Sequence, residues 1–226
     1  MIETIFLDAG GVLVHPNFDR VASALADHGV STSGEALRAV EPLAKRDLED
    51  PMFIKSSDDD SRGLVYFATV LRRAGIGIDD RVRGALTELR GYHAANNLWE
   101  TVPSDVIPFL ERLRARGLRR VVVSNANGTL HAHFDRLGLT PYFDAVFDSH
   151  VEKVEKPDPR FFEIALERSG SQKATTVHVG DFYEIDVVGA RRAGLEAILL
   201  DPTNLNHDRD CVRVRSLDEL AARLGA

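Results

Sequence analysis

The sequence of 226 residues has little cysteine and no long apolar run, and each of these absences excludes some classes of protein. Its single cysteine, Cys211, excludes an internal disulfide and a zinc site built from several thiolates. No apolar run approaches the roughly 18 residues of a membrane-spanning helix, so we expect no membrane partner. Met1 leads straight into a strand-like pattern, without the charged segment and apolar core of a signal peptide, so we expect a cytoplasmic protein.

Positive charge is also in short supply. The chain has 28 Lys and Arg against 35 Asp and Glu, which gives a formal net charge of −7. A protein that binds nucleic-acid duplexes needs a basic face, so this balance argues against a nucleic-acid partner. Hydrophobic residues make up 44% of the chain, which excludes a disordered protein. The length suits one medium domain, or a domain that carries a smaller inserted one.

Short apolar segments recur along the chain and predict the strands of a sheet. Several are apolar on both faces, which is typical of parallel strands covered by helices on each side. Helical segments separate most of them, at about residues 104–116, 158–168 and 184–193. This alternation predicts an α/β fold with a doubly wound, Rossmann-like parallel sheet. The predicted strands are residues 2–7, 120–123, 145–147, 176–179, 197–200 and 212–214.

The stretch from residue 16 to residue 98 breaks this alternation. It shows helical periodicity and no convincing strand, and its helices are expected to end near Gly29, Asp50, Gly75 and Gly91. The stretch is far too long for a simple crossover connection. We therefore predict two domains: a core of residues 1–15 and 99–226, and an inserted helical domain of residues 16–98.

Four groups of polar residues lie at or just beyond the carboxyl ends of the predicted strands. Taken singly, each has a structural explanation as a turn, a solvated lysine or a helix cap. Open α/β sheets bind their ligands at this edge, so four such groups together predict a functional site there. The groups are Asp8-Ala9-Gly10-Gly11, Ser124-Asn125, Lys156, and Gly180-Asp181 with Asp186.

In this order the motifs closely resemble those of the haloacid dehalogenase superfamily, which is largely a family of phosphatases. The segments VVVSNA, KPDPRFF and VGDFYEIDVVGARRAG carry the resemblance, which covers the whole predicted core. The helical insertion resembles the helical cap of subfamily I of that superfamily. The resemblance implies a phosphatase that acts on a small phosphorylated metabolite as a monomer or homodimer.

The resemblance also implies roles for individual residues. Asp8 is expected to attack phosphorus and form an aspartyl-phosphate. Ser124 is expected to donate its hydroxyl to the phosphoryl group, and Lys156 to neutralise charge on the nucleophile and the phosphoryl oxygens. The residues expected to bind the phosphate are Gly10, Gly11, Ser124, Asn125 and Lys156.

A carboxylate that meets a phosphate dianion needs a cation between them, and the resemblance implies Mg²⁺ in this place. Asp8, Asp181 and the Gly10 carbonyl match its expected ligands, and Asp186 matches an outer carboxylate that acts through water. Mg²⁺ keeps several waters and needs few carboxylates, so this sparse set is adequate.

Gly10 departs from the pattern of the phosphatases, which usually carry a second Asp at this position as general acid and base. Such help is worth about 10²–10⁴ in rate. Three interpretations follow: a phosphatase that favours good leaving groups such as acyl or anomeric phosphates, a 2-haloacid dehalogenase, or a catalytically weakened phosphoryl-binding or regulatory protein. His15 either shuttles protons in place of the missing Asp or packs as a linker residue against Pro16.

Overall fold

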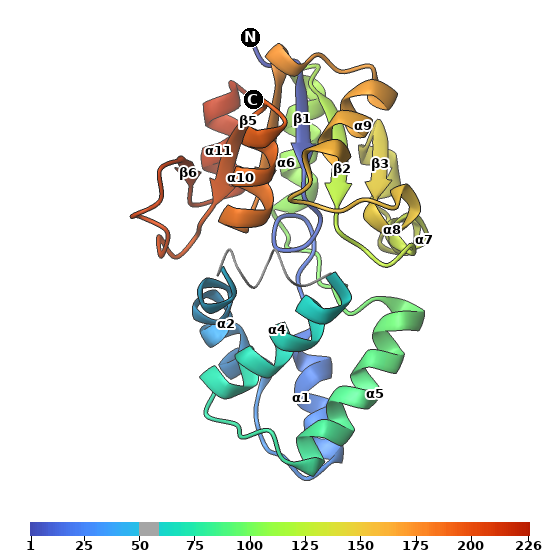
Figure 1. The fold of residues 1–226 in the computed structure, drawn as a ribbon, viewed down its shortest axis with the longest axis vertical. Coiled ribbons are helices and arrows are strands. Elements are labelled where there is room, and N and C mark those ends of the chain that lie inside the picture. The colour runs from blue at the N-terminus through green and yellow to red at the C-terminus, as the bar shows by residue number, and fades with distance from the viewer. Residues whose placement is uncertain (50–58) are drawn as a thin grey trace. The chain divides into compact units, whose positions relative to one another are not determined.

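The computed structural model describes residues 1–49 and 59–226, which form two compact units (Figure 1). Met1–His15 and Val102–Ala226 make one of them, here called the sheet unit, and Pro16–Thr101 make the other, here called the helical unit. Among the described residues, none of the helices combines the length and apolarity needed to span a lipid bilayer.

The sheet unit contains a six-stranded sheet in the order β3-β2-β1-β4-β5-β6, with every neighbouring pair parallel. Each strand lies within two residues of its predicted segment, and the predicted α/β fold is confirmed. The first strand lies between the second and the fourth, where the strand order reverses, and open α/β sheets bind ligands at this position. The strands are β1 (Thr4–Leu7), β2 (Arg119–Ser124), β3 (Ala145–Asp148), β4 (Thr176–Gly180), β5 (Glu196–Leu200) and β6 (Val212–Val214).

Helices connect these strands. The predicted helix over residues 184–193 is divided, because a π-helical turn precedes a short α-helix there. The helices are α6 (Val106–Ala115), α7 (Leu130–Leu137), α8 (Ser149–Glu152), α9 (Pro159–Ser169), α10 (Val188–Arg192) and α11 (Leu217–Leu224), with short turns η1 (Thr140–Tyr142), η2 (Lys173–Thr175) and η3 (Tyr183–Val187, the π-helical turn).

The core of the sheet unit follows from the alternation of side chains along each strand. Phe6 and Val121 are register partners on β1 and β2, and they pack in one buried cluster with Phe161 and Phe162 of α9. Leu7 is fully buried on the opposite face of β1. Helix α6 contacts both β2 and α11, so it also covers part of the sheet unit in addition to α9. Both faces of the central strands are therefore buried from solvent, as expected for strands that are apolar on both faces.

The helical unit contains α1 (Phe18–Asp27), α2 (Gly34–Leu48), α4 (Asp59–Arg73) and α5 (Asp80–Asn96) among its described residues. Helix α2 contacts both α1 and α4, and α1 also contacts α5. The helix ends expected near Gly29 and Gly75 agree with α1 and α4, whereas the end expected near Asp50 lies outside the described residues. The end expected near Gly91 is wrong, because α5 continues through it. One glycine inside a helix costs only about 1 kcal/mol, which tertiary packing overrides.

A carboxylate ties three segments of the helical unit together. Glu100 accepts hydrogen bonds from Asn17 Nδ2 at 2.9 Å, Arg20 Nε at 3.1 Å and Tyr92 Oη at 2.9 Å. The Arg20 guanidinium also stacks on the Tyr92 ring, 3.9 Å from its centroid. Burial by itself would raise the pKa of Glu100, but these donors outweigh it and hold the pKa below its ordinary value. The network joins α1, α5 and the segment that follows α5.

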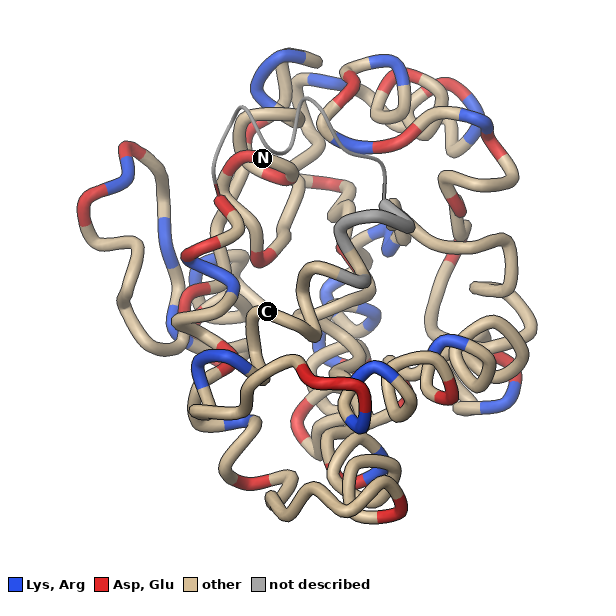
Figure 2. Tube along the Cα trace, turned by 60° about the horizontal axis from the view of Figure 1, so that its bottom comes forward, with Lys and Arg blue, Asp and Glu red and all other residues tan. Residues whose placement is uncertain are grey.

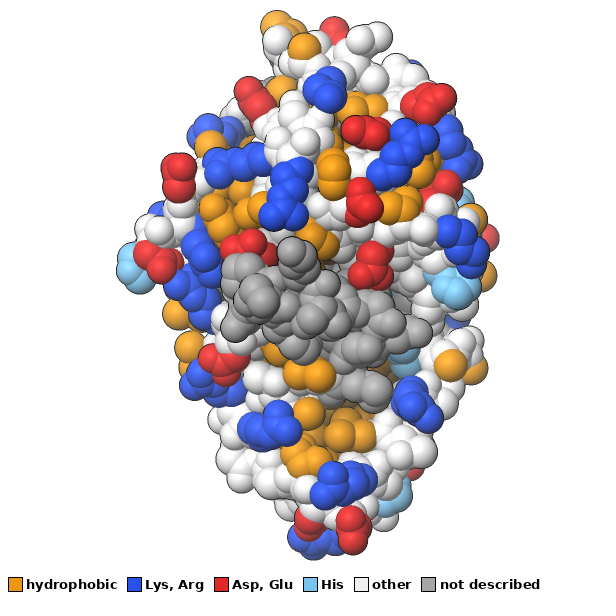
Figure 3. Space-filling model, in the orientation of Figure 1, with side chains coloured by type: hydrophobic (Ala, Val, Ile, Leu, Met, Phe, Trp, Pro, Cys, Tyr) orange, Lys and Arg blue, Asp and Glu red, His pale blue; other side chains and the backbone are white. Residues whose placement is uncertain are grey.

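Surface charge of both signs is interspersed along the chain of each unit (Figure 2). The face drawn in Figure 3 likewise carries acidic and basic side chains side by side. The net charge of −7 is therefore not gathered into one acidic patch on that face.

Candidate active site

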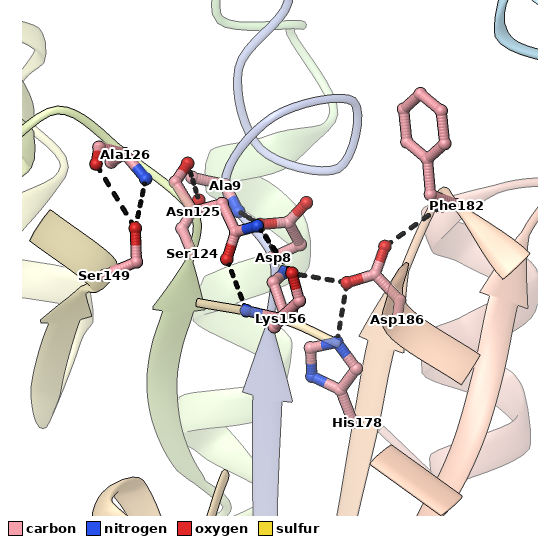
Figure 4. A network of polar contacts seen from close by, with 10 residues as sticks. All are labelled: Asp8, Ala9, Ser124, Asn125, Ala126, Ser149, Lys156, His178, Phe182 and Asp186. Atoms are coloured by element: carbon pink, nitrogen blue, oxygen red, sulfur yellow. Dashed lines mark hydrogen bonds and ion pairs between the residues drawn. The ribbon is translucent and has the colours of Figure 1, made fainter. Parts of the chain in front are cut away.

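Sequence-predicted polar residues of the sheet unit meet at the carboxyl ends of β1, β2 and β4, and Figure 4 shows five of them: Asp8, Ser124, Asn125, Lys156 and Asp186. Asp8 directly follows β1, Ser124 is the last residue of β2, and Asp181 directly follows β4. Because β1 lies between β2 and β4 and all three are parallel, their carboxyl ends share one edge of the sheet. The fold itself thus brings together residues that are far apart in the sequence.

Lys156 is the buried cation of this site. Its Nζ lies 2.9 Å from Oδ1 of Asp8 and 2.7 Å from Oδ1 of Asp186. The Lys156 side chain is 0% exposed, so water does not screen these two ion pairs. Burial would lower the pKa of Lys156, but the two carboxylates outweigh it and raise that pKa above its ordinary value. The ammonium group is therefore held charged.

Asp186 is held by three donors. Its Oδ1 accepts from Lys156 Nζ and from His178 Nε2, the latter at 3.0 Å, and its Oδ2 accepts from the Phe182 backbone N–H at 3.0 Å. Burial would raise the pKa of Asp186, but Lys156 and His178 outweigh it and keep that pKa well below the ordinary range. Gly180 provides the space, because a Cβ there would come within 2.0 Å of the Asp186 carboxyl carbon.

The pKa of Asp8 is shifted in the opposite direction from that of Asp186. Its Oδ1 accepts from the Ala9 backbone N–H at 2.8 Å as well as pairing with Lys156. Burial raises its pKa, the Asp186 charge adds to this, and the Lys156 and Ser124 contacts only partly offset the rise. Its side chain is still 13% exposed, whereas Asp186 is 1% exposed. Of these two carboxylates, Asp8 is the one that a ligand can reach.

Asp181 packs against the loop that follows β1. Gly11 in this loop has φ +71°, and a Cβ there would lie 1.7 Å from Asp181 Oδ2, so only glycine fits this position. Gly10 pairs with Val14 in an isolated bridge, which closes the loop. The close approach of loop and carboxylate keeps Asp181 beside Asp8.

The three carboxylates also lie close enough together to hold a cation. One oxygen each from Asp8, Asp181 and Asp186 lie within 4.8 Å of one another. Hard carboxylate oxygens at this spacing fit a small divalent cation such as Mg²⁺. Because both Asp186 oxygens already accept N–H groups, Asp8 and Asp181 are the carboxylates better placed to bind a cation directly.

Asn125 reaches the Lys156 backbone with both ends of its side-chain amide. Nδ2 donates to the Lys156 carbonyl at 3.0 Å, and Oδ1 accepts from the Lys156 N–H at 2.8 Å. Asn125 is a predicted phosphate-binding residue, and in the structure both ends of its amide bind the backbone of Lys156. His15, the other candidate beyond the strand ends, is the last residue of the first segment of the sheet unit.

Three polar residues that the sequence pattern does not indicate also support the site. Asp148, the last residue of β3, accepts from the backbone N–H groups of Gly128 and Leu130, and Ser149 binds both backbone groups of Ala126. These contacts anchor the loop after Ser124-Asn125. The third is the buried His178 on β4. The signal for Asp148 was a polar residue at a strand's carboxyl end, and that for His178 was an imidazole inside an apolar strand.

Comparison with known proteins identifies related chains. The sequence model of the family described as haloacid dehalogenase-like hydrolase matches residues 2–194. Haloacid dehalogenase-like hydrolase domain-containing protein 3 of Danio rerio is 38% identical over 131 residues, covering 56% of this chain and 53% of the relative. Ribulose-1,5-bisphosphate 5-phosphatase of Halopiger xanaduensis is 39% identical over 95 residues, covering 42% of this chain and 40% of the relative. The chain therefore spans about half the length of these curated relatives, or less.

A solved structure extends the likeness over the whole chain. The 2-haloacid dehalogenase from Pseudomonas syringae pv. Tomato DC3000 superposes with a TM-score of 0.62 at 26% identity, covering 100% of this chain and 99% of the other.

Proposed function

Since the chain belongs to the haloacid dehalogenase-like hydrolase family, we propose that it is a Mg²⁺-dependent phosphatase that hydrolyses a small phosphorylated metabolite. The observation that carries the proposal is the buried Lys156 ammonium, 2.9 Å from the partly exposed carboxylate of Asp8, whose oxygen in turn lies within 4.8 Å of one from Asp181. The phosphatase name of the Halopiger relative supports the same reaction class.

Asp8 is the nucleophile of the proposed reaction. One of its carboxylate oxygens forms a bond to phosphorus while the bond from phosphorus to the leaving oxygen breaks, giving an aspartyl-phosphate. Water then attacks phosphorus, and Asp8 and inorganic phosphate are released. Lys156 offsets the negative charge of Asp8 and of the phosphoryl oxygens, and the Ser124 hydroxyl donates to those oxygens.

Asp8, Asp181 and the Gly10 carbonyl would hold Mg²⁺, which supplies positive charge between the nucleophile and the phosphate dianion. Asp186 contributes through Lys156, because its oxygens are occupied by N–H donors. Gly11 leaves room for Asp181, and Asn125 fixes the backbone of Lys156. These residues orient the site and do not themselves react.

The glycine at position 10 determines which leaving groups suit this site. Gly10 has no side chain that can protonate a leaving oxygen, and such protonation is worth about 10²–10⁴ in rate. Leaving groups that depart as weak bases need no such help. Acyl and anomeric phosphates should therefore react faster than simple alkyl phosphates.

Phosphate release from a panel of phosphorylated metabolites, with Mg²⁺ and with EDTA, tests the proposal. Acetyl phosphate should be hydrolysed faster than glycerol phosphate, and EDTA should abolish both activities. Asp8→Asn should lower the rate by about 10⁴-fold or more, because the nucleophile is lost. Activity that survives either EDTA or Asp8→Asn would contradict the proposal, and equal rates on both substrates would contradict the leaving-group argument.

A second candidate is a 2-haloacid dehalogenase, in which Asp8 attacks carbon and halide leaves without a proton. The full-length likeness to the Pseudomonas enzyme and the glycine at position 10 favour it. The short distance between the Asp181 and Asp8 carboxylates counts against it. Such a spacing suits a cation site, and halide displacement needs none. Chloride release from 2-chloropropionate in the presence of EDTA would establish this reaction in place of the phosphatase.

A further inference from the structure

His178 occupies an unusual position for an imidazole. It lies in the middle of β4 with 0% exposure, and its register partners in the sheet are Phe6 and Ala197. The Phe162 ring meets it edge-on, with centroids 4.9 Å apart. Its neighbours on this face belong to the apolar cluster beneath α9, where an aliphatic side chain would be the ordinary occupant.

The hydrogen bonds of His178 are one-sided. Nε2 lies 3.0 Å from Asp186 Oδ1, while Nδ1 is buried and has no hydrogen-bond partner within the part of the chain that the structure describes. A carboxylate oxygen only accepts, so Nε2 carries the proton and Nδ1 of the neutral ring is a bare acceptor. Leaving a polar atom buried and unpaired is unfavourable, so packing alone does not explain a histidine here. The contact with Asp186 does explain it.

Asp186 Oδ1 is shared between His178 and Lys156, and Lys156 in turn pairs with Asp8 (Figure 4). With Phe182 N–H on the other oxygen, the carboxylate has two neutral donors and one charged partner. The neutral donors fix its orientation without adding a second cation that would compete with Lys156. The direction of the Lys156 ammonium therefore depends on a carboxylate that His178 holds in place.

We propose that His178 is a positioning residue, which orients Asp186 so that Lys156 remains directed at Asp8. The kinetic part of this inference rests on the proposed phosphatase function, whereas its structural part does not. The competing role, orienting Asp186 toward a bound cation, makes a different prediction. Loss of His178 would then weaken Mg²⁺ activation, whereas misdirection of Lys156 lowers the rate of the chemical step.

Two substitutions at one position separate these roles. His178→Leu removes the N–H and keeps an apolar side chain, and His178→Gln keeps an N–H that can reach Asp186. We expect His178→Leu to lower kcat by about 10–100-fold, the range found for residues that orient an active group. KM and the Mg²⁺ concentration for half activation should stay within about threefold of the wild-type values, and His178→Gln should recover most of kcat. Thr176→Val, a buried change on the same strand that alters only a bond to the Gln172 carbonyl, is the matched control and should leave kcat unchanged.

A wild-type kcat in His178→Leu would overturn the proposal, as would a loss confined to Mg²⁺ activation or equal losses in His178→Leu and His178→Gln. If His178→Leu does not fold, the kcat of His178→Gln still decides, because a loss of about 10-fold or more with the N–H retained would also overturn it.

A second measurement does not depend on activity. Nitrogen-15 NMR of the histidine rings should show His178 as a neutral ring protonated at Nε2. In Asp186→Ala the Nε2–H loses its acceptor, so the signal of a hydrogen-bonded Nε2–H should disappear. A ring protonated at Nδ1 would overturn the proposal even in an active enzyme. If the wild-type protein releases no phosphate from any substrate, the proposed function fails, and the NMR result still decides the role of His178.

Discussion

The two units of this protein each organise several side chains around one carboxylate, but under opposite conditions. Asp186 in the sheet unit is 1% exposed and its partner Lys156 is 0% exposed. Glu100 in the helical unit is 15% exposed, and its partner Arg20 is 43% exposed. Water therefore weakens the second pairing and not the first.

This difference in exposure suits the Asp186 network to holding a charge at a reactive site and the Glu100 network to joining helices. A buried ion pair loses its hydration, so it is weak evidence for stability, yet it keeps a charge fixed at one point. A half-exposed network stays partly hydrated and joins elements at little cost. Asp186 and Lys156 meet at the edge of the sheet where Asp8 lies, whereas Glu100 joins α1 to α5. Burial of charge thus distinguishes the Asp186 network from the Glu100 network, although each carboxylate accepts from three donors.

The largest expected effect tests the buried network. Lys156→Met keeps most of the side-chain volume but leaves Asp8 and Asp186 without their cation, so it should destabilise the fold by about 3–5 kcal/mol at neutral pH. Urea denaturation followed by circular dichroism measures this loss. The exposed Lys173→Met is the control and should change stability by less than about 0.5 kcal/mol. A loss below about 1 kcal/mol in Lys156→Met would show that water reaches the two carboxylates.

A smaller effect is expected in the helical unit. Glu100→Gln keeps the shape of the side chain and weakens its bonds to Arg20, Asn17 and Tyr92, so it should cost about 1 kcal/mol after screening by water. Glu88→Gln is the control in the same unit, because Glu88 is 56% exposed and pairs only with His28 at 3.3 Å among the contacts described. A loss as large as that of Lys156→Met would remove the contrast between the units.

The same variant makes a prediction about pH. The pKa of Glu100 lies below its ordinary value of 4.5 in the folded protein, so the folded state favours the charged form. Its stabilising contribution is then present above pH 4.5 and is lost as pH falls through the folded pKa. The stability difference between wild type and Glu100→Gln should therefore persist at pH 7 and disappear in acid. Urea denaturation at several pH values measures it, and a difference that grows in acid would contradict the assignment.

The helix caps predict effects that are equal in the two units and no larger than the effect of Glu100→Gln. Ser33 caps α2 by accepting from the Ala36 N–H at 3.1 Å, and Ser216 caps α11 by accepting from the Glu219 N–H at 3.1 Å. Both caps do the same local work, so Ser33→Ala and Ser216→Ala should each cost about 1 kcal/mol in thermal unfolding. A cap that matters in only one unit would show that the units differ in helix stability as well as in buried charge.

The sequence predicts most of the sheet because its strands are apolar on both faces and are bounded by clear turn residues. Polar residues at the strand ends are also recognisable, since their position along the chain fixes the edge where they meet. Side-chain partners are not predictable in this way. The amide of Asn125 binds Lys156, a residue 31 positions away, and only the folded sheet shows this. The sequence does not indicate a role for His178, because one imidazole in a strand carries no periodic signal.

The helical unit shows the corresponding limit for helices. Glycine marks a helix end where its φ is positive, as Gly29 and Gly75 show after α1 and α4, but Gly91 lies inside α5. Whether a glycine ends a helix depends on the contacts that its neighbours make, and those contacts are tertiary.

The strand order has a consequence for how the protein is made. The first strand lies between β2 and β4, so β1 has both its neighbours only after residue 180 has been synthesised. The helical unit is one continuous segment, Pro16–Thr101, which is synthesised before either neighbour of β1. Asp8 therefore has no Lys156 partner until more than half of the chain has been synthesised. A stalled or truncated product that ends before β4 contains Asp8, the proposed nucleophile, but lacks Asp181 and Asp186.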